Sequence, residues 1–107
     1  MSTLYLKPNP TLRDYQEYVA QMIVERGFDQ ETTPQMFMML MEECGELAKA
    51  ARKQANIKTD AKSEVFKLGH EAADILMYLL DICNHFNVDL ETSFREKEEL
   101  NKQRTWN

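Results

Sequence analysis

The sequence predicts an all-α fold, a four-helix bundle. Apolar residues recur at helical spacing in four segments, and short polar connections separate these segments. The 107 residues include only three glycines, three prolines and no long β-branched run, whereas seven methionines favour helices packed on helices. This length is close to the commonest domain size. We therefore expect a single all-α domain over residues 11–107, preceded by an extended arm over residues 1–10.

The first helix is expected to begin after Thr11, which is a good N-cap, and to end near Gly27. The second has two recognised start signals. Either Thr32 forms a capping box with Gln35, or Thr33 is the cap and a proline follows it in the first helical position. In both cases the helix runs to about residue 55.

The third helix is expected to follow a short loop with Thr59 or Asp60 as its cap, and to extend to about Asn87. A fourth helix then starts at Asp89 as the cap and runs through about residue 104. All connections are short, as antiparallel bundles require.

Four carboxylates form two pairs, Glu43 with Glu46 and Glu71 with Asp74. Each pair has i,i+3 spacing, which places both groups on one side of a helix, one turn apart. Both pairs lie in apolar helical stretches, where unpaired negative charge is costly. If the two helices pack face to face, a divalent cation is the usual remedy, and oxygen ligands favour Mg²⁺, Mn²⁺ or Ca²⁺ over zinc.

The position of each acid on its helix can be compared with the apolar stripe. At about 100° per residue, Glu43 lies inside the stripe of the second helix and Glu46 at its edge. On the third helix, Glu71 borders a stripe that includes Leu68, Ala72 and Leu79, and the second acid of that pair lies about 60° further round. Acids at this spacing also occur on solvated helix faces, so this alternative stays open from periodicity alone.

The bulk composition excludes several classes of protein. A net charge of −5 argues against a binder of nucleic acid polymers, which would present a basic face. Cys44 and Cys83 are far apart and in apolar contexts, so we expect free thiols in a reducing compartment. No run approaches the roughly 20 apolar residues of a membrane span. We expect a cytoplasmic protein without a membrane partner.

The acidic pairs resemble the double motif of the MazG-type all-α nucleoside triphosphate pyrophosphohydrolases, which are related to dimeric dUTP hydrolases and phosphoribosyl-ATP pyrophosphohydrolases. The family pattern is Glu-Glu-x-x-Glu, a spacer, then Glu-x-x-Asp. Here it reads EECGE over residues 42–46, 24 intervening residues, then EAAD over residues 71–74. The resemblance covers roughly residues 33–105 and implies the MazG architecture.

This resemblance also implies an activity, namely Mg²⁺-dependent cleavage between the α and β phosphates of a nucleoside triphosphate, with Mn²⁺ as a substitute. It implies four metal ligands, of which Glu43 and Glu46 are also expected to act in catalysis, Glu46 by activating water. Glu42 would be an extra acid that tunes the metal. The metal ligands that the resemblance implies are Glu43, Glu46, Glu71 and Asp74. The expected substrate-binding residues are Lys97, Asn101 and Arg104 for triphosphate and sugar, and Phe28, Gln35 and Trp106 for the base.

Alternatives remain at this point. The same architecture could serve a dUTP or phosphoribosyl-ATP hydrolase, or a helical interaction module without catalysis, in which Lys97 and Arg104 merely pair with nearby glutamates. Both acidic helices are apolar over more than one face, so we expect a homodimer or homotetramer. House-cleaning of the nucleotide pool is the role that the resemblance implies.

Overall fold

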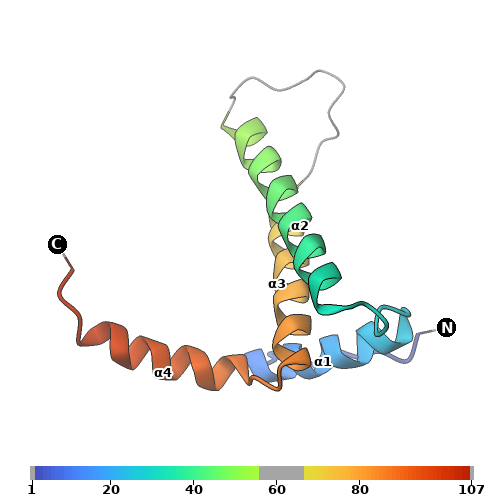
Figure 1. The fold of residues 1–107 in the computed structure, drawn as a ribbon, viewed down its shortest axis with the longest axis horizontal. Coiled ribbons are helices and arrows are strands. Elements are labelled where there is room, and N and C mark those ends of the chain that lie inside the picture. The colour runs from blue at the N-terminus through green and yellow to red at the C-terminus, as the bar shows by residue number, and fades with distance from the viewer. Residues whose placement is uncertain (1, 56–66, 107) are drawn as a thin grey trace. The chain divides into compact units, whose positions relative to one another are not determined.

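A computed structural model describes residues 2–55 and 67–106. It contains the four expected helices and, within those residues, no strand, which confirms the all-α class (Figure 1). None of the described helices is long and apolar enough to cross a bilayer. The helices are α1 (Leu12–Glu25), α2 (Thr33–Gln54), α3 (Leu68–His85) and α4 (Leu90–Lys102).

Two of the helices begin with complete capping boxes. At α1, the Thr11 hydroxyl accepts from the Asp14 N–H at 3.2 Å, and the Thr11 N–H donates to the Asp14 carboxylate at 2.8 Å. At α2, Thr32 and Gln35 exchange the same two bonds, at 3.4 and 2.8 Å. Thr32 is therefore the cap, and the alternative start at Thr33 is wrong by one residue. Each box satisfies backbone donors that a helix start leaves unpaired.

Residues with a positive φ follow the ends of two helices. After α1, Gly27 adopts a φ of +77°, and after α3, Asn87 adopts a φ of +57°, which asparagine tolerates better than most residues. The Val88 N–H then donates to the Cys83 carbonyl at 2.8 Å and closes the end of α3. The fourth helix ends at Lys102, two residues earlier than expected.

The start of α3 differs from the expected one. The predicted caps Thr59 and Asp60 lie outside the described residues. Lys67 is described and lies outside the helix, while its carbonyl accepts the first helical bond, from the Glu71 N–H at 3.1 Å. The regular helix therefore begins at Leu68, only three residues before the first acid of its pair.

The chain divides into two compact units, residues 1–30 with 80–107, and residues 31–79. The core of the first unit includes Val19 and Met22 of α1 and Leu80 of α3, which is 1% exposed. The arm before α1 is non-helical and tied to the end of that helix, because the Ser2 hydroxyl donates to the Glu25 carboxylate at 2.8 Å.

The polar latch of the first unit consists of Gln16, Asn84 and the main chain of Val88 and Leu90. The buried Gln16 amide donates to the Asn84 side chain at 3.1 Å and to the Val88 carbonyl at 2.6 Å, and accepts from the Leu90 N–H at 3.0 Å. One α1 side chain thus satisfies groups at the end of α3 and the start of α4. This buried polar residue is stable because all its donors and acceptors are used.

The second unit holds α2 and most of α3. Its buried side chains include Met36, Ala50 and, unexpectedly for a charged residue, Glu71. The predicted core stripe of α3 is wrong in part, since Leu68, at 38% exposed, and Leu79, at 37%, face solvent in a single copy of the chain. Ala72, in the same stripe, is also exposed. In the N-terminal half of α3, Glu71 is therefore more buried than the stripe residues Leu68 and Ala72.

Candidate active site

Three of the four predicted metal ligands meet in the second unit. The carboxylates of Glu43 and Glu46, from α2, and of Glu71, from α3, each offer an oxygen, and these oxygens all lie within 4.8 Å of one another. The spacing of three residues brings the two α2 acids to one side of the helix. We refer to these three residues as the acidic cluster.

Asp74 lies one helical turn beyond Glu71 and is half-buried. It is outside the group of oxygens within 4.8 Å, but its charge contributes to the raised pKa of both Glu43 and Glu71. The fourth acid therefore acts on the cluster electrostatically. This position agrees with the sequence pattern, which places Asp74 further round the helix from the apolar stripe than Glu71.

The cluster is poorly solvated, and some of its oxygens have no partner within the described ranges. Glu71 is 6% exposed, and one carboxylate oxygen each of Glu43 and Glu71 is buried without a hydrogen-bond donor. Burial, followed by the charges of Glu46 and Asp74, raises the pKa of Glu43 to about 7. Burial and the neighbouring Glu46 also raise the pKa of Glu71. Within residues 2–55 and 67–106, no cationic side chain forms an ion pair with these acids.

This donor set fits a hard divalent cation. Carboxylate oxygens are the preferred ligands of Mg²⁺, Mn²⁺ and Ca²⁺, and oxygens within 4.8 Å of one another are close enough to bind one cation. A cation there would provide the partner that the buried oxygens of Glu43 and Glu71 lack. It would also favour the ionised form of both acids, opposing the effect of burial on their pKa.

Two further residues belong to the surroundings of the cluster. Glu42, the predicted tuning acid, is exposed on α2. Tyr78 was missed by the sequence reasoning and is half-buried on α3, with its pKa raised by burial and then by the charges of Glu31 and Glu43. Its spacing of four and seven residues from the two α3 acids was a signal that could have identified it.

The predicted triphosphate-binding residues lie in the first unit. Lys97 and Asn101 are on α4, and within the described residues neither Lys97 nor Arg104 forms an ion pair, so the expectation that they merely neutralise nearby glutamates is wrong there. The Arg104 guanidinium stacks at 4.5 Å over the ring of Trp106, whose indole N–H donates to the Asn101 carbonyl at 3.3 Å.

The predicted base-contacting residues have different surroundings. Phe28 is 45% exposed and follows the end of α1. Gln35 is exposed, and its side-chain oxygen is used in the capping box of α2, which leaves the amide N–H groups available. Trp106 is 68% exposed. These two aromatic faces could stack on any base and do not distinguish among bases.

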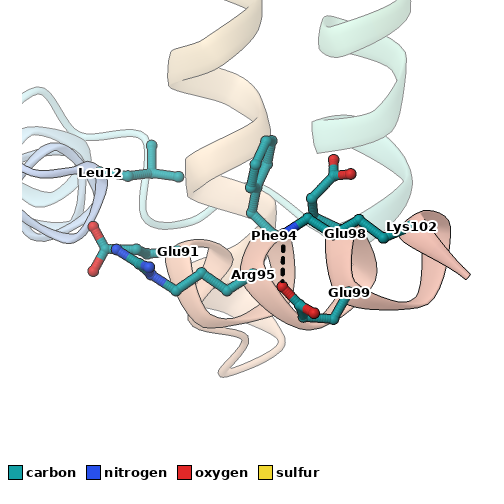
Figure 2. A pocket seen from close by; sticks show the side chains of 7 residues that line it. All are labelled: Leu12, Glu91, Phe94, Arg95, Glu98, Glu99 and Lys102. Carbon is teal, nitrogen blue, oxygen red and sulfur yellow. Dashed lines mark hydrogen bonds and ion pairs between the residues drawn. The ribbon is translucent and has the colours of Figure 1, made fainter.

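A separate groove runs along α4 in the first unit (Figure 2). Phe94 is its main apolar residue, and the Lys102 ammonium donates to the Glu99 carboxylate at 3.0 Å on its wall. Its charges are mixed, and it includes none of the predicted substrate-binding residues. The lining residues are Leu12, Glu91, Phe94, Arg95, Glu98, Glu99 and Lys102.

The fold and the cluster define an all-α protein with paired acids on two facing helices. The sequence matches the family profile described as the MazG nucleotide pyrophosphohydrolase domain over residues 31–105. The chain belongs to this family, whose enzymes generally depend on a divalent metal. The predicted resemblance is thereby confirmed.

Curated relatives and a solved structure agree with this assignment. The dCTP pyrophosphatase 1 proteins of Rattus norvegicus and Mus musculus are each 29% identical over 102 residues, which is 91% of this chain and 60% of theirs. The chain therefore spans about three fifths of the length of these relatives. The proposed pyrophosphatase YPJD of Bacillus subtilis has the same fold, with a TM-score of 0.77, 22% identity, and coverage of 92% of this chain and all of that one.

Proposed function

We propose that this protein is a Mg²⁺-dependent nucleoside triphosphate pyrophosphohydrolase, which releases a monophosphate and pyrophosphate. The observation that carries this proposal is the pair of buried carboxylate oxygens, on Glu43 and Glu71, that have no hydrogen-bond partner in the described part of the chain. A structural cluster of acids would be paired with cations of the protein. An acidic cluster that lacks such partners is suited to a cation that arrives with its substrate.

The residues can be assigned roles in the reaction. Water attacks the α phosphorus, and the bond from that phosphorus to the bridging oxygen of the β phosphate breaks. Glu46 is half-buried at the edge of the cluster, where water can reach it, and it accepts the proton of the attacking water. Glu43, Glu46, Glu71 and Asp74 would hold the cation, as the resemblance implies, and the first three offer oxygens that lie within 4.8 Å of one another. When bound, Mg²⁺ neutralises the phosphates and stabilises the charge on the departing pyrophosphate.

For further positive charge at the phosphates we assign Lys97, on α4, and Arg104, just after it, as the resemblance implies. Lys97 and Arg104 form no ion pairs within the described residues, so their charges are available to phosphate oxygens. Asn101, four residues after Lys97 on one face of the helix, would contact the sugar. The stack of Arg104 on Trp106 fixes the guanidinium next to an aromatic face that could receive a base.

Deoxynucleotides are the substrates we favour, because two relatives are named as dCTP pyrophosphatases. A house-cleaning role in the cytoplasm would follow, consistent with the two free cysteines. A dUTP or phosphoribosyl-ATP hydrolase of the same architecture is the alternative. A panel of these nucleotides with Mg²⁺, with products resolved by phosphorus NMR, tests the proposal. Release of orthophosphate alone, or of nothing from any nucleotide, would reject it.

A non-catalytic helical module is distinguished by its response to metal. In the enzyme, Mg²⁺ at 100 times its dissociation constant adds about 2.7 kcal/mol to the free energy of unfolding. In a module whose acids are only solvating, the melting temperature does not change when Mg²⁺ is added. The matched measurement is the melting temperature in the same buffer with a chelator.

We further propose that the working form is a homodimer or homotetramer. An exposed stripe on α2 combines Met38, 70% exposed, and Met41, 66% exposed, with the small residues Gly45 and Ala48 at helical spacing. A side chain added at Gly45 would meet nothing within 4 Å in one copy, which leaves room for a second helix to approach closely. Met41→Glu should reduce the particle mass in light scattering, whereas Lys53→Glu, also exposed on α2, should not. An unchanged mass for Met41→Glu contradicts the proposal.

A further inference from the structure

The Arg104 guanidinium, just after the end of α4, is held in place without being neutralised. It lies 4.5 Å from the centre of the Trp106 ring, over one face of that ring. Within residues 2–55 and 67–106 it forms no ion pair and donates no hydrogen bond. A cation–π stack uses the flat face of a guanidinium and leaves its N–H groups, which point outward in its plane, available to an anion.

Trp106 is itself tied to the end of the helix. Its indole N–H donates to the Asn101 carbonyl at 3.3 Å, and the same carbonyl accepts the backbone N–H of Arg104 at 3.1 Å. Asn101 lies in the last turn of α4, where helical carbonyls have no donor within the helix. Both residues of the stack therefore donate to one acceptor at a fixed place on the helix, which fixes the ring and, through the ring, the guanidinium.

The pair is not held by burial. Trp106 is 68% exposed, and Arg104 is exposed as well. A free arginine side chain at such a place samples many rotamers, and ordering it when a ligand binds weakens the affinity. The carbonyls at the end of a helix also attract a guanidinium, and contact with them would use its N–H groups. The stack on Trp106 opposes both effects, because it orders the side chain and leaves the donors free.

The geometry leaves little of Trp106 for a base. Arg104 covers one face of the ring, and the Asn101 carbonyl uses the polar edge of the indole. We propose that Trp106 is a positioning residue, which holds the Arg104 guanidinium ready for phosphate oxygens, and that this, not contact with the base, is its contribution to nucleotide binding. The inference rests on the proposed function, in which Arg104 binds the triphosphate. Trp106 should then matter equally for every nucleotide.

Inorganic tripolyphosphate with Mg²⁺ tests this directly, because it has the phosphates of the substrate but no sugar or base. In calorimetry, Arg104→Gln should weaken its binding at least about tenfold, as expected for the loss of a hydrogen bond to a charged group. Trp106→Leu should weaken it about threefold, the size of an exposed cation–π contact. In the Arg104→Gln background, Trp106→Leu should have no measurable effect, because the ring then has no guanidinium to position.

Two variants serve as controls. Phe94→Leu removes another aromatic ring of α4, 65% exposed, and should leave the binding of tripolyphosphate unchanged. Trp106→Phe keeps an aromatic face and should recover part of the affinity that Trp106→Leu loses. With dCTP and dUTP as substrates, Trp106→Leu should lower kcat/KM about threefold for both. A base contact predicts instead no loss with tripolyphosphate and unequal losses with the two nucleotides, and that result would overturn the inference.

Fluorescence and calorimetry separate this inference from the proposed reaction, because neither requires turnover. Trp106 is the only tryptophan of the chain, so its quenching by acrylamide reports the stack, and Arg104→Gln should increase this quenching by uncovering one face of the ring. Coupled effects of Arg104→Gln and Trp106→Leu on tripolyphosphate binding support the inference even if no nucleotide is cleaved, in which case only the proposed reaction fails. Unchanged quenching, additive effects of the two substitutions, or no binding of tripolyphosphate by the wild type would overturn the inference, whether or not nucleotides are cleaved.

Discussion

The acidic cluster and the polar latch are both buried polar groups, yet they are organised in opposite ways. In the latch, the Gln16 amide makes three hydrogen bonds of 2.6 to 3.1 Å to groups near the α3–α4 turn. In the cluster, one buried oxygen each of Glu43 and Glu71 has no donor among the residues that the structure describes. The latch is complete with protein atoms alone, whereas the described residues supply no donor to the buried oxygens of the cluster.

Two carboxylates show the same contrast through their pKa. Asp89, beside the latch, accepts from the Arg13 guanidinium at 2.8 Å, and Arg13 and Thr92 lower its pKa to about 2. Burial and like charges raise the pKa of Glu43 to about 7. An acid with a cationic partner serves the fold, and an acid surrounded by other acids is suited to a ligand.

The largest expected effect comes from neutralising the cluster. Glu43→Gln and Asp74→Asn should each lower turnover at least a hundredfold, since loss of a ligand should exceed the tenfold to hundredfold cost of losing its supporting groups. Without metal, the melting temperature should stay the same or rise, because a neutral amide relieves repulsion. Pyrophosphate release measures the turnover, and thermal unfolding in the presence of a chelator measures the melting temperature without metal. Normal turnover in both variants would show that the acidic cluster is not the metal site of the reaction.

The opposite pattern is expected for the latch. Gln16→Leu leaves the Leu90 N–H and the Val88 carbonyl without a partner, which should lower the free energy of unfolding by about 2 to 4 kcal/mol. Gln21→Leu, exposed on the same helix, should change it by less than about 0.5 kcal/mol. Urea unfolding measures both, and equal stabilities would show that the latch contributes little.

Parts of this comparison could be predicted from sequence because they are local. Thr11 with Asp14 and Thr32 with Gln35 are three residues apart, so their capping boxes depend on one turn of chain. The acidic pairs have the same short spacing. Only one further assumption is needed to bring Glu43, Glu46 and Glu71 together, namely that their two helices face each other. Local rules fix the side of a helix on which each acid lies.

Other parts depend on contacts between distant residues. Gln16 finds its partners 68 to 74 residues later in the chain, and a lone glutamine in an amphipathic helix gives no sign of this. Glu31 is similar, because nothing in its local sequence indicates that one oxygen becomes buried without a donor. The rotation of α3, which buries Glu71 and exposes Leu68 and Leu79, is set by packing and not by periodicity.

The pH dependence of metal binding sharpens the contrast. The pKa of Glu43 rises from 4.5 to about 7 on folding, so the protonated acid stabilises the metal-free fold at low pH. This contribution to the free energy of unfolding is lost as pH rises from 4.5 to 7. Metal binding needs the ionised acids, so stabilisation by Mg²⁺ should grow over the same interval. Thermal unfolding with Mg²⁺ and with chelator, from about pH 5 to about pH 8, measures the difference. A Mg²⁺ effect independent of pH would contradict the raised pKa.

The smallest effect is expected at Asp89, and it has the opposite sign. Its pKa falls from 3.8 to about 2 on folding, so its contribution to stability is present above pH 3.8 and is lost as pH falls through about 2. Asp89→Asn keeps an N-cap for α4 but removes the charge that Arg13 contacts, so acid unfolding should become less steep in this interval. The effect is small because the pair is largely solvent-exposed. Arg13→Gln should reproduce it, and an acid transition unchanged in both variants would mean that the Arg13–Asp89 pair does not set the low pKa.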